Sequence, residues 1–305
     1  MRVFVTGATG LVGRPLCAAL VEAGHEVVAL SRSRSPPGLP PAARLVEGDP
    51  VAAGPWQEEL QRCDACVHLA GEPVAGGRWT AARKARIRDS RVLSTRHVAE
   101  VLERGGPSVL VSGSAVGFYG PRGDEPLDED SPPGDGFLAE VVQEWEAAAR
   151  PAAARARVVL LRTGVVLSPR GGALEQLMLP FRFFVGGPLG DGAFWQSWIH
   201  LADEVGLVRF ALEDRAVEGP LVAAAPEPVR NRDLARALGR ALGRPSALPT
   251  PVAAVKLALG ELAEIAVTGQ RVLPAKALRL GYRFRFPELG PALADLLAAR
   301  SRTAG

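Results

Sequence analysis

Three glycines near the N-terminus have the spacing of a phosphate-binding turn. They read GxxGxxG directly after the apolar run 3–5 and directly before a stretch with helical apolar spacing. Glycines in this context permit a tight turn and close backbone approach, and the amides that open the helix attract an anion. A second match at 117–123 is followed by Asp-Glu-Pro instead of a helix. A purely structural turn is the alternative, but the context favours a bound pyrophosphate, contacted by Gly7, Thr9, Gly10, Leu11, Val12 and Gly13.

The next predicted strand ends in a hydroxyl and two guanidinium groups, Ser31-Arg32-Ser33-Arg34. A carboxylate at this place would accept a hydrogen bond from the 2′-hydroxyl of an adenosine ribose and would repel a 2′-phosphate. Ser31 and Arg32 instead suit a 2′-phosphate, because arginine forms charge-assisted, forked hydrogen bonds with it. The alternative is a solvated basic loop. The sequence therefore predicts a dinucleotide site that prefers NADP(H).

Strands and helices alternate through the first half of the chain, which predicts βαβ units and a parallel sheet. We expect an α/β fold of the Rossmann-like, doubly wound kind, with a smaller C-terminal substrate lobe. Strands are predicted at 3–5, 26–30, 65–69, 108–112, 158–161 and 221–225, and helices at 14–23, 80–104, 137–150, 232–242 and 251–268. Residues 1–165, completed by 218–243, would form the NADP-binding domain, and residues 166–217 and 244–305 the substrate lobe.

Composition excludes several classes of protein. A net charge of +3 over 305 residues does not provide the concentrated basic face that nucleic-acid binding needs. The seven basic residues between 78 and 96 leave three interpretations: a solvated face, phosphate contact or nucleic-acid contact. We find no signal peptide or apolar stretch long enough for a membrane span, and we expect a cytoplasmic protein. The cysteines, Cys17, Cys63 and Cys66, are expected to be buried, and with four scattered histidines they build no metal site.

Several further segments resemble one known family. Residues 6–13 and Asp64-Ala-Cys-Val-His-Leu-Ala-Gly-Glu-Pro73 resemble the extended short-chain dehydrogenase/reductases. Segments at 78–79, 90–91, 112–120, 186–190, 198–200 and 269–274 are similar to an atypical branch, the epimerase-family proteins often labelled nucleoside-diphosphate-sugar epimerase or cell-division inhibitor. This resemblance spans nearly the whole chain. It implies NADP(H) binding, with the adenosine half beside Leu69 and Ala70, Arg91 reaching toward the cofactor, and Val166 near the nicotinamide.

The resemblance also implies that this chain lacks the acid–base pair of its superfamily. The superfamily uses Tyr-x-x-x-Lys as a general acid and base, in which the lysine charge lowers the tyrosine pKa. By alignment those positions fall at Phe137 and Val141, and neither can transfer a proton. Ser112, Ser114 and Tyr119 remain near the expected strand end, where they would polarise a carbonyl. The alternative for the serines is ordinary hydrogen bonding at the end of a strand.

Three residues are candidates for substrate contact. Glu72 and Arg78 follow a predicted strand at the edge where such sheets bind ligands, and His200 lies in Trp-Ile-His, where a packed histidine is the alternative. Two functions remain open. The first is an NADP(H)-dependent oxidoreductase or epimerase-like enzyme that acts on a small polar carbonyl or sugar-nucleotide-like substrate. The second is a non-catalytic NADP(H) sensor or interaction protein. The sequence makes no prediction of oligomeric state.

Overall fold

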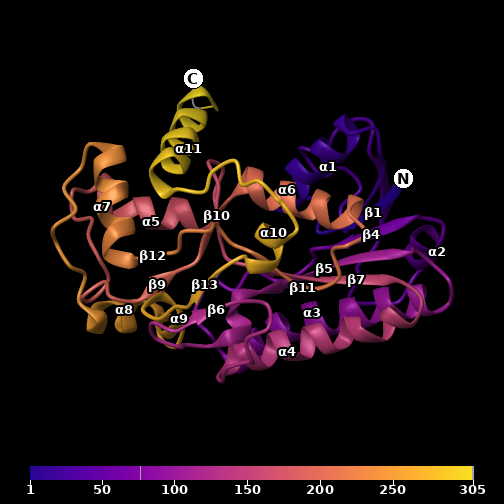
Figure 1. Ribbon diagram of the computed structural model, residues 1–305, viewed down its shortest axis with the longest axis horizontal. Coiled ribbons are helices and arrows are strands. Elements are labelled where there is room, and N and C mark those ends of the chain that lie inside the picture. Colours follow the sequence, from indigo (N-terminus) through magenta and orange to yellow (C-terminus); the bar gives the residue numbers. More distant parts are fainter. Residues whose placement is uncertain (76, 304–305) are drawn as a thin grey trace.

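A seven-stranded, wholly parallel sheet forms the centre of the molecule (Figure 1). The structure is a computed structural model that describes residues 1–75 and 77–303. The strand order is β11-β7-β5-β4-β1-β2-β3. The strands are β1 (Arg2–Thr6), β2 (Glu26–Ser31), β3 (Arg44–Glu47), β4 (Ala65–His68), β5 (Val109–Ala115), β7 (Arg157–Thr163) and β11 (Gly219–Ala223). The predicted α/β, Rossmann-like fold is confirmed.

Helices cover both faces of the sheet, because its strands are apolar on both sides. Val3 and Val5 of β1 pack into one cluster, with α1 (Gly13–Glu22) and α6 (Leu201–Glu213). Phe4 packs into the other, with α2 (Trp56–Gln61) and α3 (Ala81–Glu103). Figure 1 shows α4 (Phe137–Ala149) beside α3 on this second face. β2 and β3 lie on one side of β1, whereas β4 and the later strands of this sheet lie on the other, so a crevice opens at the carboxyl ends of β1, β2 and β4.

The C-terminal part builds a core of its own beyond the sheet. α5 (Ala173–Arg182), α7 (Asn231–Leu242) and α11 (Leu289–Thr303) contribute to one apolar cluster. Three two-stranded sheets accompany them: β8 (Val165–Leu167) with β10 (Trp198–His200), β9 (Trp195–Gln196) with β12 (Val229–Arg230), and β6 (Pro126–Leu127) with β13 (Arg271–Val272). The predicted domain boundaries stay a prediction, and Gly76, Ala304 and Gly305, which those domains include, lie outside the described residues.

The prediction of one long helix over residues 251–268 is wrong. The stretch 251–268 forms two helices, α8 (Val252–Leu259) and α9 (Leu262–Ala266). Gly260 separates them with a φ of +62°, a left-handed conformation that ends α8.

The remaining elements are two short 3₁₀ segments, η1 (Val116–Tyr119) and η2 (Arg150–Ala154), and the helix α10 (Ala275–Arg279). Within residues 1–75 and 77–303, no helix has the length and hydropathy needed to cross a bilayer.

Candidate functional site

The turn between β1 and α1 is compact because two of its positions have no room for a side chain. Gly7 has a φ of +66°, and its carbonyl accepts a hydrogen bond from the Gly10 amide at 2.9 Å. A Cβ atom at Gly13 would lie 2.1 Å from the Gly7 oxygen. α1 begins at Gly13 with no side-chain cap. The Arg14 amide donates to the Gly10 carbonyl at 3.2 Å, and Pro15 has no amide hydrogen, so in the described chain the amides of Leu11, Val12 and Gly13 are the ones at this helix start that remain available to an anionic ligand.

A cavity of about 310 Å³ lies at this turn, at the carboxyl ends of β1, β2 and β4. It brings together eight residues that the sequence analysis singled out: Gly7, Thr9, Gly10, Ser31, Arg32, Leu69, Ala70 and Glu72. A Cβ atom at Gly7 would lie 2.7 Å from the Leu69 carbonyl carbon, so the glycine turn and the loop after β4 are in direct contact. The two loops together form one continuous wall.

At the end of β2, the two arginines of the basic segment have different partners. Arg34 forms an ion pair with Glu47, with its Nε 2.8 Å from Oε2. Arg32 lines the cavity and is exposed, and it has no hydrogen bond or ion pair within the described part of the chain. The Ser31 hydroxyl accepts the Ser33 amide at 3.0 Å. Arg32 is therefore the guanidinium of this segment that is available to a ligand.

One side of the cavity is formed by residues that were not predicted from the sequence. Gly48, Asp49, Pro50 and Val51 line it, and they directly follow β3. β3 itself was not predicted, because only its two central residues, Leu45 and Val46, are apolar. The signal in the sequence was the Gly-Asp-Pro turn at 48–50 after this short run.

Several predicted cofactor residues lie away from the cavity wall. Arg91 donates from Nη1 to the carbonyls of Glu72 and Ile87, both at 3.0 Å, and burial lowers its pKa to about 10. It thus holds the loop after β4. Leu11 faces Gly172, where a Cβ atom would lie 2.8 Å from its Cδ2. Val166 pairs with Ile199 in the β8–β10 ladder. Arg91, Leu11 and Val166, together with Val12 and Gly13, stay predictions as cofactor contacts.

A histidine that the sequence analysis did not assign lies beneath the cavity. His68, the last residue of β4, is fully buried between the hydroxyls of Thr6 and Ser94. Its Nδ1 is 2.7 Å from the Thr6 hydroxyl oxygen, and its Nε2 is 3.0 Å from that of Ser94. Burial lowers its pKa to about 4, so the ring is neutral at pH 7. Its position at a strand end, directly before Leu69 and Ala70, was the available signal.

Two of the three candidate catalytic residues, Ser114 and Tyr119, belong to a buried ionic network. The Ser114 hydroxyl donates to Glu146 Oε1 at 2.6 Å, and Arg162 forms a two-pronged ion pair with the same carboxylate. Arg162 Nη1 also donates to the Tyr119 hydroxyl at 3.0 Å. Tyr119 is fully buried, which raises its pKa to about 12 despite the nearby cation. Ser112 is also fully buried and donates to the Gly113 carbonyl at 3.3 Å. These hydroxyls face protein groups, and their catalytic role stays a prediction.

The positions aligned with the missing acid–base pair, Phe137 and Val141, pack as structural side chains. The Phe137 ring packs edge-on against Trp79, with centroids 5.1 Å apart. Lys84 Nζ lies 5.2 Å from the centre of the Phe137 ring and forms an ion pair with Glu261. Val141 is buried in the face of α4. Among the described residues, no group of three or more potential ligands gathers that could hold a metal ion.

Two of the substrate candidates make structural contacts. His200 Nδ1 accepts the Ala202 amide at 3.0 Å and so caps α6, while its ring stacks on Phe286 at 3.9 Å. Arg78 donates to the Leu257 carbonyl at 2.8 Å, which ties the start of α3 to α8. Glu72 lines the cavity and lies 3.4 Å from an Arg83 nitrogen. All three stay predictions as substrate contacts.

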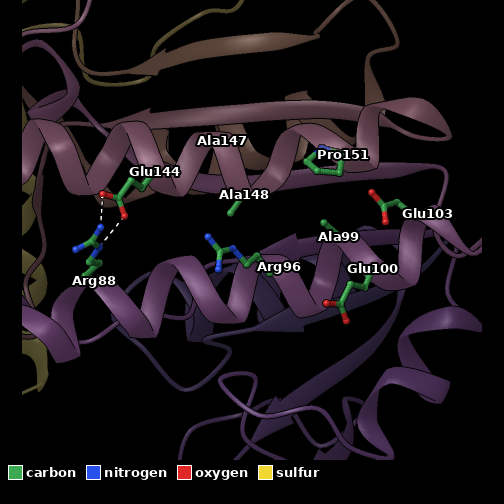
Figure 2. A pocket seen from close by; sticks show the side chains of 9 residues that line it. All are labelled: Arg88, Arg96, Ala99, Glu100, Glu103, Glu144, Ala147, Ala148 and Pro151. Carbon is green, nitrogen blue, oxygen red and sulfur yellow. Dashed lines mark hydrogen bonds and ion pairs between the residues drawn. The ribbon is translucent and has the colours of Figure 1, made fainter.

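A larger hollow, of about 560 Å³, lies elsewhere, along the outer groove between α3 and α4 (Figure 2). Arg88 reaches across it from α3 to Glu144 on α4, with two bonds of 2.6 Å. Its charged lining is mixed: it includes Arg88 and Arg96 as well as Glu100, Glu103 and Glu144. The groove contains none of the predicted site residues. Several arginines of the basic stretch thus pair with acids or carbonyls, as a structural face does.

The comparisons with known proteins agree with this geometry. The NAD dependent epimerase/dehydratase family matches residues 3–223. The chain belongs to this family. A domain of unknown function matches residues 250–296.

Relatives in the epimerase/dehydratase family match over nearly the full chain. The epimerase family protein SDR39U1 of Bos taurus is 41% identical and covers 98% of this chain and 100% of its own length. A chloroplastic SDR39U1 homologue of Arabidopsis thaliana is 40% identical, and the match covers 97% of this chain and 87% of the homologue. The crystal structure of human SDR39U1 with NADPH has a TM-score of 0.87 and 36% identity, and covers 98% and 99% of the two chains. The predicted family resemblance is confirmed.

Proposed function

We propose that this epimerase-family protein binds NADP(H) in the cavity at the carboxyl ends of β1, β2 and β4. The observation that carries the proposal is Arg32, an exposed guanidinium without a partner in the described chain, at the place where the adenosine 2′-phosphate would lie. Ser31 precedes it, where NAD-selective sites carry a carboxylate. The human relative crystallised with NADPH supports the same assignment.

The residues present fit this cofactor. The turn at Gly7 and Gly13 is a cradle that a Cβ atom would fill, which leaves its amides beside the pyrophosphate. Leu69 and Ala70 supply an apolar wall for the adenosine half, as the family resemblance implies. Bound NADP(H) would supply a hydride donor or acceptor. The residues of this chain would bind and orient it and shield it from water.

We propose further that the protein is an NADP(H)-dependent oxidoreductase or epimerase-like enzyme acting on a small polar carbonyl or sugar-nucleotide-like substrate. Family membership supports this function. Ser112, Ser114 and Tyr119 are the proposed polar groups near the reacting carbon, with Glu72, Arg78 and His200 as proposed substrate contacts. A place in the cytoplasm is proposed on the three buried, free cysteines, which suit a reducing compartment. The Arabidopsis relative is chloroplastic.

A second candidate, a non-catalytic NADP(H) sensor, is favoured by one specific observation. Ser114 and Tyr119 bond to the buried pair of Glu146 and Arg162, and Phe137 takes the place of the general acid. Such a protein would keep the cofactor fold and change partner affinity with cofactor state.

One experiment separates the two functions. The purified protein is loaded with NADPH and offered a panel of carbonyl compounds and sugar nucleotides, and the absorbance of the reduced nicotinamide is followed. An enzyme oxidises the cofactor with at least one compound, and Ser114→Ala abolishes turnover without loss of NADPH binding. A sensor binds NADPH in a one-to-one ratio and oxidises none. Absence of NADPH binding by the folded wild-type chain would refute both.

A further inference from the structure

A directional chain of hydrogen bonds runs beneath the cofactor cavity. Ser94 donates its single hydroxyl proton to the Ser90 carbonyl, 2.6 Å away. The Ser94 oxygen can then only accept from His68 Nε2, which therefore carries the ring proton. Because the ring is neutral, Nδ1 is an acceptor, and it takes the proton of the Thr6 hydroxyl. The Thr6 oxygen in turn accepts the Ala70 amide at 3.2 Å.

The chain ends on the cavity wall itself. Ala70 and Leu69 line the cavity, and both are tied to Thr6: the Ala70 amide to its hydroxyl, and the Leu69 amide to its carbonyl at 3.3 Å. Gly7 is in contact with this wall, because a Cβ atom there would lie 2.7 Å from Leu69 and 2.9 Å from the Ala70 nitrogen. A shift of the loop after β4 would therefore move the glycine turn as well.

We propose that His68 is a positioning residue for the bound cofactor, which fixes the loop after β4 against the glycine turn through Thr6. This inference rests on the proposed function. His68 is fully buried, so it does not touch the cofactor and acts through Thr6 and Ala70. With the ring neutral and its proton on Nε2, every hydroxyl and the Ala70 amide have a partner, whereas a second ring proton would face the Thr6 hydroxyl proton. The loop then has a single position before the cofactor arrives, which lowers the ordering cost of binding.

The test measures the dissociation constants of NADPH and NADH by calorimetry for the wild type and His68→Leu, with thermal unfolding of each protein. His68→Leu removes both hydrogen bonds at similar volume, and we expect the dissociation constant for NADPH to rise about tenfold. The factor should be the same for NADH, because the wall contacts the part that the two cofactors share. Ser94→Ala, which keeps the ring, should weaken binding in the same direction and serves if His68→Leu does not fold.

The double variant Thr6→Val, His68→Leu separates positioning from stability. Replacing both partners by apolar groups leaves no buried hydroxyl unpaired, so the melting temperature should recover toward that of the wild type. Thr6→Val removes the hydroxyl that accepts the Ala70 amide, so the loop after β4 is not anchored and NADPH binding should stay weak. Thr6→Ser keeps the hydroxyl and should bind like the wild type.

Two results would overturn the proposal about His68: unchanged NADPH binding in His68→Leu, or a double variant that recovers both affinity for NADPH and stability. Neither result would contradict the proposed function of the cavity as an NADP(H) site. A wild-type chain that is folded and does not bind NADPH would overturn the proposed function instead, and this inference with it.

Discussion

Replacing Arg32 by alanine tests the cofactor preference directly. Arg32 lines the cavity at the end of β2, and its side chain has no hydrogen bond or ion pair among the described residues, so its removal breaks no such internal bond. We expect Arg32→Ala to weaken NADPH binding selectively, because NADH lacks the 2′-phosphate that the guanidinium would contact. Folding stability should stay at the wild-type level.

The expected size follows from the exposure of the side chain. A hydrogen bond to a charged group contributes about 1.5–3 kcal/mol when it is shielded from water. Arg32 is exposed, so solvent screening reduces this to about 1–2 kcal/mol. The dissociation constant for NADPH should therefore rise about 5- to 30-fold.

Isothermal calorimetry with NADPH and NADH measures the change, and Arg34→Ala is the matched control. Arg34 lies two residues away, carries the same charge, and is bonded to Glu47 instead of facing the cavity. It should therefore change NADPH affinity far less than Arg32→Ala does. Added salt should weaken NADPH binding to the wild type more than to Arg32→Ala, because screening acts on the charge pair that the variant lacks.

The reasoning would be refuted if Arg32→Ala lost affinity for NADPH and NADH by equal factors, or if Arg34→Ala matched it. Equal losses would mean that Arg32 acts through the fold of the loop. Matched losses would mean that the general positive charge of the segment attracts the cofactor.

Three other changes follow from the geometry. Gly13→Ala places a methyl group 2.1 Å from a backbone oxygen of the same turn, so it should cost about 1–3 kcal/mol of folding free energy in urea unfolding and abolish NADPH binding; wild-type affinity would contradict the described turn. Burial raises the pKa of Glu204 to about 8 from 4.5, so the folded chain binds this proton more tightly and stability should fall as pH rises between those values. Glu204→Gln should remove this decline in urea midpoints, and an unchanged slope would exclude Glu204 as its source. Glu146→Gln leaves the Arg162 charge buried without compensation and should cost about 3–5 kcal/mol. The same change at the exposed Glu144 should cost far less, and equal costs would contradict the role of burial.

The sequence predicted the elements whose apolar pattern is strong. β1 and β2 are apolar at successive positions because both faces of the sheet are covered, and this pattern is visible without coordinates. β3 escaped prediction because it is an edge strand with only two partly buried apolar residues. The break at Gly260 was also missed, because the apolar spacing continues across it and a single glycine does not always end a helix.

The site was predicted unevenly for a similar reason. Residues that bind through the backbone or as free side chains, such as Gly7 and Arg32, carry their signal in local sequence. Residues whose role depends on a partner far away in the chain carry no such signal in the local sequence. From the sequence alone Ser114 looked like a free hydroxyl, but in the structure it donates a hydrogen bond to Glu146, which is 32 positions later.

The sequence by itself determined the fold class, the glycine turn and the basic residue after β2, because each depends on a few neighbouring residues and on the two-sided burial of short strands. Only the tertiary structure decided which polar groups are available to a ligand. Folding left the Arg32 side chain without a hydrogen bond or ion pair among residues 1–75 and 77–303, placed His68 between two hydroxyls, and buried Tyr119 against Arg162. Hydrogen bonds between segments that are far apart in the chain settle such questions, and no local pattern records them.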